Sequence, residues 1–125
     1  MKFKFINIIA LLASALTLPV AARRLAPSIV APLTVDADCR CIVDETMAKW
    51  GRLDVLVNNA GTTTYVNHTD LEGLTPEVWE RTFSVNVFGT FQMVRAAEKA
   101  LRASGNGCVV NVGSIAGVAG IGSSI

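Results

Sequence analysis

Two short apolar runs separated by one long helical pattern constrain the fold of this chain more than any other feature. Residues 53–57 (Leu-Asp-Val-Leu-Val) and 108–112 (Cys-Val-Val-Asn-Val) are rich in β-branched residues, which is typical of buried strands. Between them, from Thr75 to about Ala103, apolar residues recur at helical spacing. A strand, a helix and a second strand in this order form a right-handed crossover, so we expect the two strands to be parallel.

The sequence before the first of these strands continues the alternation. Asp36 is a suitable N-cap for a helix that Gly51 would end. The apolar positions of this helix recur at helical spacing: Cys39, Ile42, Val43, Met47 and Trp50. Residues 28–33 predict a further strand, which Pro32 confines to a sheet edge or a strand end. The predicted fold class is α/β, with a partial doubly wound parallel sheet of the Rossmann-like kind over residues 28–125.

The N-terminal segment differs in character from the rest of the chain. Lys2 and Lys4 precede an apolar run over residues 6–18, and small residues follow at positions 20–22. A basic start, an apolar stretch and a small-residue exit are typical of a secretory signal peptide. The run is shorter than the roughly 20 apolar residues that span a membrane. We expect residues 1–22 to form a signal-like segment outside the fold, and a buried strand or helix at the domain's edge is the alternative.

Composition argues against several other classes of protein. The net charge of +1, without a run of lysine and arginine, argues against a nucleic-acid partner. The three cysteines cannot form a closed set of disulfides, and with His68 as the single histidine they provide no zinc site. A hydrophobic content of 51% is too high for a disordered chain. The sequence therefore favours one small globular domain with no metal and no nucleic acid.

Small and polar residues at the ends of the predicted strands are the candidates for a binding site. Asn58, Asn59, Ala60 and Gly61 follow the first strand, and Ser114 follows the second. Ligands of parallel sheets bind beyond the carboxyl ends of the strands, where both groups would lie. A strand-ending turn and an ordinary loop serine are the alternative interpretations, and the pattern alone does not decide between them.

Two further asparagines stand out. The predicted apolar stripe of the long helix comprises Trp79, Phe83, Asn86, Thr90, Val94, Ala97 and Leu101. Because Asn86 falls on this stripe, its amide must find hydrogen-bond partners, either from neighbouring backbone or in a site. Asn67-His68-Thr69 has the form of an N-glycosylation sequon, and one such triplet is also expected by chance. Taken alone, neither asparagine identifies a function.

Three segments, in this order, resemble the short-chain dehydrogenase/reductase family. They are Leu-Asp-Val-Leu-Val-Asn-Asn-Ala-Gly at 53–61, Ser-Val-Asn-Val at 84–87 and Asn-Val-Gly-Ser-Ile-Ala-Gly at 111–117. Residues 28–125 are similar to the middle of a classical member of the 3-oxoacyl-reductase kind. The resemblance implies an oxidoreductase that moves a hydride between NAD or NADP and a secondary alcohol or ketone. It also implies a cytoplasmic location, although the signal-like N-terminus leaves export open.

The resemblance also implies roles for the candidate residues. By this likeness, Ser114 positions the carbonyl or hydroxyl group of a small-molecule substrate, and Asn86 holds a proton-relay water through the helix. Four residues would lie beside the cofactor and support the central sheet: Asn58, Asn59, Ala60 and Gly61. In the family the helix corresponding to the one with Asn86 packs against a partner subunit, which implies a homo-oligomer.

The sequence departs from the family pattern at three places. No glycine-rich phosphate loop precedes Asn58, and Pro32 stands where relatives usually carry an aspartate that meets the adenine. The Tyr-x-x-x-Lys pair is missing, because the only tyrosine, Tyr65, is followed four residues later by Thr69. We therefore expect a fragment that is inactive alone and binds neither dinucleotide, with a non-catalytic truncated product or dimerisation scaffold as the alternative. The DNA beyond codon 125 is expected to encode the missing pair.

Overall fold

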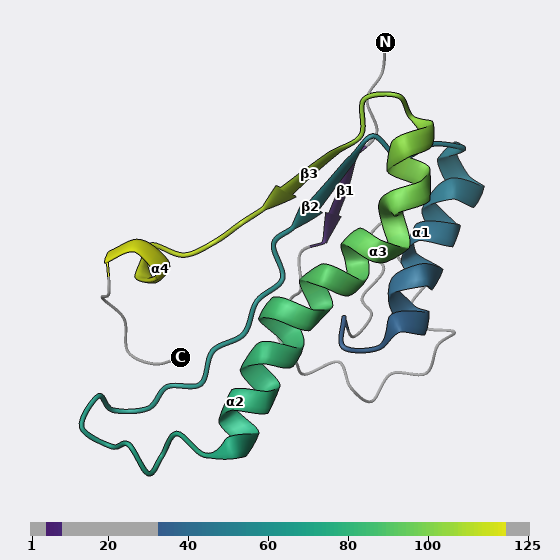
Figure 1. The fold of residues 1–125 in the computed structure, drawn as a ribbon. Helices are drawn as coiled ribbons and strands as arrows, with labels where there is room; N and C mark the ends of the chain where they lie inside the picture. Colours follow the sequence, from purple (N-terminus) through teal and green to yellow (C-terminus); the bar gives the residue numbers. More distant parts are fainter. Residues whose placement is uncertain (1–4, 9–32, 120–125) are drawn as a thin grey trace.

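The computed structural model describes residues 5–8 and 33–119, which form a parallel sheet with helices packed on one face (Figure 1). Its strands are β1 (Phe5–Ile8), β2 (Val55–Asn58) and β3 (Cys108–Asn111), and they lie side by side in that order. The register aligns Ile8 with Asn58, and Asn58 with Asn111. The carboxyl ends of all three strands therefore meet at one edge of the sheet.

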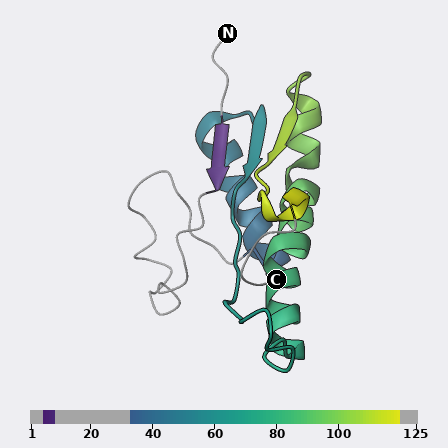
Figure 2. The ribbon, with the colours of Figure 1, turned by 90° about the vertical axis from the view of Figure 1, so that its left-hand side faces the viewer.

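Helical segments connect these strands. Helix α1 (Asp36–Trp50) precedes β2, and a continuous helical segment joins β2 to β3. This segment consists of α2 (Pro76–Phe83), a π-helical turn η2 (Ser84–Gly89) and α3 (Thr90–Ala103). A short helix, α4 (Ala116–Ala119), follows β3. Figures 1 and 2 show α1 and α3 on the same face of the sheet. The predicted α/β alternation and parallel pairing are confirmed.

The core lies between α1, β2 and α3. Its buried apolar side chains are Leu33, Cys39, Ile42, Val43, Leu53, Leu56, Met93, Ala97, Ala100 and Leu101. Helix α1 ends as predicted at Gly51, whose φ of 71° is left-handed and whose amide donates to the Met47 carbonyl at 2.8 Å. Gly89 lets the long helix approach the turn before α1, since a Cβ there would lie 2.9 Å from the Leu33 Cβ. Both glycines are therefore required by the local backbone geometry.

The N-terminal segment is placed differently from the prediction at residues 5–8. These residues pair in parallel with β2 and lie in the sheet, so residues 1–22 do not all lie outside the fold. The physical reason is that a signal-like apolar run and a buried parallel strand share the same composition, which the pattern cannot separate. The remainder of the segment lies outside the described residues, and its signal-like character stays a prediction.

The predicted strand over residues 28–33 also falls largely outside the described residues, as does Pro32. Leu33 is described, and it lies buried in a turn rather than in a strand. No helix among residues 33–119 is both long and apolar enough to cross a membrane.

The predicted apolar stripe of the long helix is wrong in its first half. Trp79 and Phe83 are 42% and 43% exposed, and Asn86 is exposed, whereas Ala97 and Leu101 are buried. The reason is the π-helical turn, which was not predicted from the sequence. A π-turn contains more residues per turn than an α-helix, so it shifts the faces of α2 relative to those of α3. A stripe drawn at a constant 3.6-residue spacing cannot follow that shift.

Candidate functional site

A pair of asparagine side chains joins β2 to β3 at their carboxyl ends. Asn58 Nδ2 donates to Asn111 Oδ1 at 2.9 Å, and the Val112 amide donates to the Asn58 carbonyl at 2.8 Å. Asn58 is 5% exposed, so its side chain lies within the sheet layer rather than in solvent. This amide pair adds a side-chain hydrogen bond to the backbone ladder where the ladder ends.

One atom of this pair lacks a partner. Asn58 Oδ1 is buried and accepts no hydrogen bond from the residues that the structure describes. A buried polar atom left without a partner costs about 1–3 kcal/mol, so this oxygen favours a donor from water or from a bound molecule. The strand ends thus carry an acceptor that the described fold does not satisfy.

Asn86 closes the loop that follows β2. Its Oδ1 accepts from the Thr62 amide at 2.8 Å, and its Nδ2 donates to the Thr62 carbonyl at 2.8 Å. The side chain thus pairs with both main-chain groups of one residue, as a neighbouring strand would. Asn86 is exposed rather than buried, which corrects the predicted position on the apolar stripe. Its described side-chain partners are backbone groups, one of the two alternatives that the sequence left open.

The π-helical turn presents Asn86 to this loop. Thr90 Oγ1 donates to the main-chain carbonyl of Asn86 at 3.0 Å, within the segment where the regular α-helical ladder is interrupted. Such turns inside α-helices occur frequently at functional sites. The hydrogen bond from Thr90 supports the change from α-helical to π-helical geometry. The side chain of Asn86 then connects this helical turn to the loop after β2.

The remaining residues of the turn after β2 divide between core and solvent. Asn59 and Gly61 are exposed, while Ala60 is partly buried and packs against the core. A Cβ at Gly61 would lie 3.6 Å from Asn86 Oδ1, which is an ordinary contact distance. The small residues therefore allow the loop and the helix to approach each other without strain.

Ser114 lies beyond the end of β3. Its side chain is exposed, and Oγ accepts a hydrogen bond from the Ala116 amide at 3.2 Å, at the start of α4. Figure 1 shows α4 at the end of β3, away from α1 and α3. The described contacts bring Asn58 to Asn111 and Asn86 to Thr62, but none of them connects Ser114 to Asn86.

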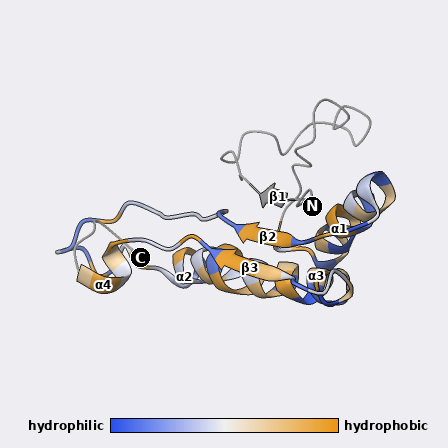
Figure 3. Cartoon of the chain, turned by 90° about the horizontal axis from the view of Figure 1, so that it is seen from above, coloured by the Kyte–Doolittle hydropathy of each residue, from blue (hydrophilic) through white to orange (hydrophobic). Residues whose placement is uncertain are grey.

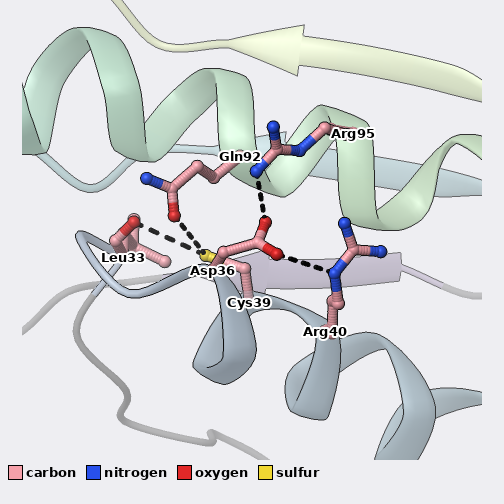
Figure 4. A network of polar contacts seen from close by, with 6 residues as sticks. All are labelled: Leu33, Asp36, Cys39, Arg40, Gln92 and Arg95. Carbon is pink, nitrogen blue, oxygen red and sulfur yellow. Dashed lines mark hydrogen bonds and ion pairs between the residues drawn. The ribbon is translucent and has the colours of Figure 1, made fainter.

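A polar network connects the start of α1 to α3, on the face of the sheet that both helices cover (Figure 4). Asp36 accepts from Arg40 Nε at 2.8 Å and from an Arg95 Nη at 2.6 Å. The Arg95 hydrogen bond, followed by that of Arg40, lowers the pKa of Asp36. The nearby Cys39 thiol donates to the Leu33 carbonyl at 3.5 Å. Burial raises the pKa of Cys39, so its thiol stays protonated and has a structural role.

Arg52 and Asp54 form an ion pair at the start of β2 that the sequence analysis missed. Arg52 Nε and one Nη lie 2.9 and 2.5 Å from the two carboxylate oxygens of Asp54, and Asp54 is 1% exposed. The hydrogen bonds that Arg52 donates to the Asp54 carboxylate raise the pKa of Arg52. A carboxylate within an apolar run, two residues after an arginine, was the available signal, because such residues face the same side of a strand.

Two partners of the candidate residues were also missed. Asn111 could have been found, because it ends the second strand as Asn58 ends the first, and parallel register places the two side by side. Thr62 could not have been found from its residue type, because Asn86 binds only its main-chain groups. No group of three or more His, Cys, Asp or Glu side chains that could hold a metal occurs in the described part of the chain.

A parallel sheet with helices on its face and polar residues at the carboxyl ends of its strands defines an α/β domain of the nucleotide-binding class. The chain belongs to the short-chain dehydrogenase family, whose model matches residues 12–125. It is 53% identical over 95 residues to the "Granaticin polyketide synthase putative ketoacyl reductase 2" of Streptomyces violaceoruber. Over 88 residues it is 36% identical to a 3-alpha-(or 20-beta)-hydroxysteroid dehydrogenase of Mycobacterium tuberculosis.

Solved structures agree with this family assignment. A "putative short-chain dehydrogenase/reductase" from Burkholderia xenovorans superposes with a TM-score of 0.73 at 43% identity, over 77% of this chain and 40% of that one. ElxO with NADP bound superposes with a TM-score of 0.67 at 30% identity, over 75% and 37% of the two chains. The aligned regions cover 76% of this chain and 38% of the Streptomyces protein, and 70% and 33% for the Mycobacterium protein. The chain therefore spans well under half the length of its relatives.

The cofactor of this family is NAD or NADP. The described residues fit only part of such a molecule. The strand ends offer the unsatisfied Asn58 Oδ1, and a Cβ at Gly113 would have nothing within 4 Å, so there is space beside β3. The first glycine of the sequence is Gly51, however, so no glycine-rich loop precedes β2 to hold a pyrophosphate with its amides. This chain supplies a strand-end surface but not the phosphate-binding loop.

Proposed function

We propose that this chain is the central part of an NAD(P)-dependent oxidoreductase that moves a hydride between nicotinamide and a secondary alcohol or ketone. The observation that carries the proposal is the double hydrogen bond of Asn86 to Thr62, which joins a π-helical turn to the end of β2. Family membership supports it. So do the names of a ketoacyl reductase and a hydroxysteroid dehydrogenase among the relatives.

In this proposed function, residues of the chain bind and orient the substrate and the cofactor. Asn86 fixes the loop after β2 and holds a relay water through its helix. The exposed Ser114 hydroxyl positions the oxygen of a small alcohol or ketone. The four residues from Asn58 to Gly61 form the surface beside the cofactor, and their small side chains allow its close approach.

We further propose that the 125-residue chain does not turn over substrate alone. Tyr65 is 76% exposed in a loop and is not followed by a lysine at the fourth position, so it is not the expected proton donor. The chain also lacks the phosphate loop before β2. Titration calorimetry of the isolated chain is expected to show no binding of NAD or NADP, and micromolar binding of either would contradict this part.

A chimera tests the catalytic proposal. The matching 95-residue segment of the Streptomyces relative is replaced by the corresponding segment of this chain, and ketone-dependent oxidation of NADPH or NADH is measured. We expect an active chimera, with activity falling at least about tenfold in Asn86→Ala and in Ser114→Ala, as for loss of one positioned hydrogen bond. Ser104→Ala, which alters a hydroxyl at the end of α3, is the matched control. A folded chimera whose activity is unaffected by both site variants would refute the assigned roles.

The alternative function is a non-catalytic scaffold that assembles into a homo-oligomer through the helix carrying Asn86. The observation that favours it is an exposed apolar patch on the long helical segment, formed by Trp79, Phe83, Val87, Phe88 and Phe91. The rings of Trp79 and Phe83 lie 5.9 Å apart, and Phe91 is 59% exposed. Large contiguous apolar patches on a small domain mark interaction sites.

Sedimentation of the purified chain tests this alternative. We expect a dimer that Phe88→Glu converts to a monomer, because a buried unpaired carboxylate opposes association. Leu71→Glu adds the same charge at an exposed loop residue outside the patch, and it should leave the dimer intact. A monomeric parent chain would exclude the scaffold without affecting the catalytic proposal.

A further inference from the structure

The two parts of the proposed site are connected through the ends of β2 and β3. Asn86 binds the main chain of Thr62, four residues after β2 ends at Asn58. Ser114 lies three residues after β3 ends at Asn111. None of the described contacts connects Ser114 to Asn86 directly, so their relative placement depends on how the two strand ends are held together. The residues that join these ends are therefore candidates for a positioning role.

A side-chain and a main-chain hydrogen bond hold the end of β2 to the end of β3. The parallel register aligns Asn58 with Asn111, and Asn58 Nδ2 donates to Asn111 Oδ1 at 2.9 Å. The Val112 amide donates to the Asn58 carbonyl at 2.8 Å. Beyond Val112 the chain leaves the ladder, and a Cβ at Gly113 would meet nothing within 4 Å. Among the described hydrogen bonds, the amide pair is the side-chain link between the strands that lies closest in sequence to Ser114.

Asn111 also determines which way the Asn58 amide faces. A side-chain amide has a donor end, Nδ2, and an acceptor end, Oδ1, of nearly the same shape, so shape alone does not fix its orientation. Asn58 is 5% exposed, so its polar groups depend on partners other than bulk solvent. The bond to Asn111 Oδ1 directs the donor end toward β3 and the acceptor end away from Asn111. That acceptor, Asn58 Oδ1, is the buried atom without a partner among the described residues, so Asn111 determines where this acceptor lies.

We infer that Asn111 is a positioning residue of the proposed site. Its side-chain oxygen sets the orientation of the Asn58 amide and, by tying the strand ends together, the place of Ser114 relative to the loop that Asn86 holds. The consequence for catalysis rests on the proposed oxidoreductase function, whereas the orientation of the Asn58 amide does not. The role requires an acceptor at residue 111, which aspartate supplies and leucine, of similar size, does not.

Nuclear magnetic resonance of the full chain tests the orientation. In the parent we expect the Asn58 Nδ2 protons to exchange slowly with solvent, because the amide is buried and hydrogen-bonded. In Asn111→Leu this exchange should be at least about fivefold faster, as for the loss of one hydrogen bond, and the resonance of the Ser114 amide should shift. Asn106→Leu, the same substitution in the exposed turn before β3, is the matched control and should change neither.

Asn111→Asp is the sharper variant. A carboxylate only accepts hydrogen bonds, so it retains the bond from Asn58 Nδ2 and should keep the exchange rate of the parent. If Asn111 instead donated its own Nδ2 to Asn58 Oδ1, this variant would place oxygen against oxygen and would be as impaired as Asn111→Leu. Equal impairment of the two variants would therefore overturn the inference, and so would exchange at the parent rate in Asn111→Leu.

The chimera described above tests the catalytic consequence. When kcat is expressed per folded protein, a loss of stability alone does not lower it. Asn111→Leu should lower this kcat at least about fivefold, with less change in the KM of the cofactor, because Ser114 is displaced from the substrate oxygen. Asn111→Asp should stay close to the parent value. Parent kcat in Asn111→Leu would overturn the positioning role. An inactive unmodified chimera would instead count against the proposed function, and the exchange measurements would then decide on Asn111.

Discussion

Strands β2 and β3 have the same length and similar composition and lie side by side, yet they differ in burial. Leu56 in β2 is 0% exposed, whereas every residue of β3 is exposed, with Val110 at 43%. Helices α1 and α3 and two neighbouring strands surround β2, while β3 has a described neighbour on one side only. Figure 3 shows that β3 is nonetheless mostly apolar. Burial of a strand is therefore set by the layers around it, and an equally apolar strand without them presents its side chains to solvent.

The largest expected effect comes from truncating one apolar side chain on each of the two strands. Leu56→Ala is expected to reduce the free energy of unfolding by about 2–5 kcal/mol, because it leaves a cavity in the core. Val110→Ala should change it by no more than about 0.5 kcal/mol, as for other exposed positions. Chemical denaturation followed by circular dichroism measures both. Similar losses in the two variants would show that β3 is covered in solution, for example by a second copy.

Two glycines provide the next test. Gly89→Ala places a Cβ 2.9 Å from the Leu33 Cβ and 3.3 Å from its carbonyl oxygen, whereas a Cβ at Gly113 meets nothing within 4 Å. Overpacking costs about 1–3 kcal/mol. The higher helix propensity of alanine stabilises the folded state by about 1 kcal/mol, which offsets part of this cost. We therefore expect Gly89→Ala to lower the melting temperature and Gly113→Ala to leave it nearly unchanged. A stabilised Gly89→Ala variant would mean that the Leu33 turn moves away at little cost.

A smaller effect is expected where the packed region meets the loop. Asn86→Ala removes two hydrogen bonds to Thr62, which lie at the surface and are worth about 1 kcal/mol in all after exchange with water. The loop after residue 62 should then be cut faster by a protease, while the core variants accelerate cleavage throughout the chain. Asn106→Ala, in the exposed turn after α3, is the control and should leave the cleavage rate unchanged. An unchanged loop in Asn86→Ala would argue against its positioning role.

The contrast also shows how far the sequence could predict this molecule. The α1 helix, its end at Gly51, the two strands and their parallel pairing follow from local signals, and the structure has them close to the predicted positions. The predicted burial of β3 was wrong, because hydropathy does not state which layers are present. Asn86 was predicted on the buried face of the helix, which is wrong because a π-turn has no simple residue signature. Strand β1 was not predicted, because apolar export signals and buried strands have similar sequences. The candidate residues at the strand ends were predicted from motif and position, and their functional roles stay a prediction. Their hydrogen-bond partners, Asn111 and the main chain of Thr62, depend on the strand register and on the path of the backbone, which the structure provides.

The smallest expected effect concerns the ion pairs that connect α1 to α3. Arg95, followed by Arg40, lowers the pKa of Asp36, so the folded state binds the carboxylate form more strongly than the unfolded state does. Its contribution is therefore present above the ordinary carboxylate pKa of about 4, and is lost as pH falls through the lower folded value. Asp36→Asn should lower the denaturation midpoint slightly at pH 7, and the difference from the parent should shrink as pH falls below about 4.

Salt distinguishes this effect from a change in packing. Asp36 is partly exposed, so added salt should screen the pairs and reduce the difference between parent and Asp36→Asn at pH 7. Asp44→Asn, on the same helix and outside the described ion pairs, is the matched control and should show no such dependence on salt. If the difference between parent and Asp36→Asn is undiminished well below pH 4 and in high salt, residue 36 acts through helix packing rather than through its charge. The ion pairs of Asp36 with Arg40 and Arg95 would then add little to the stability of the packed region.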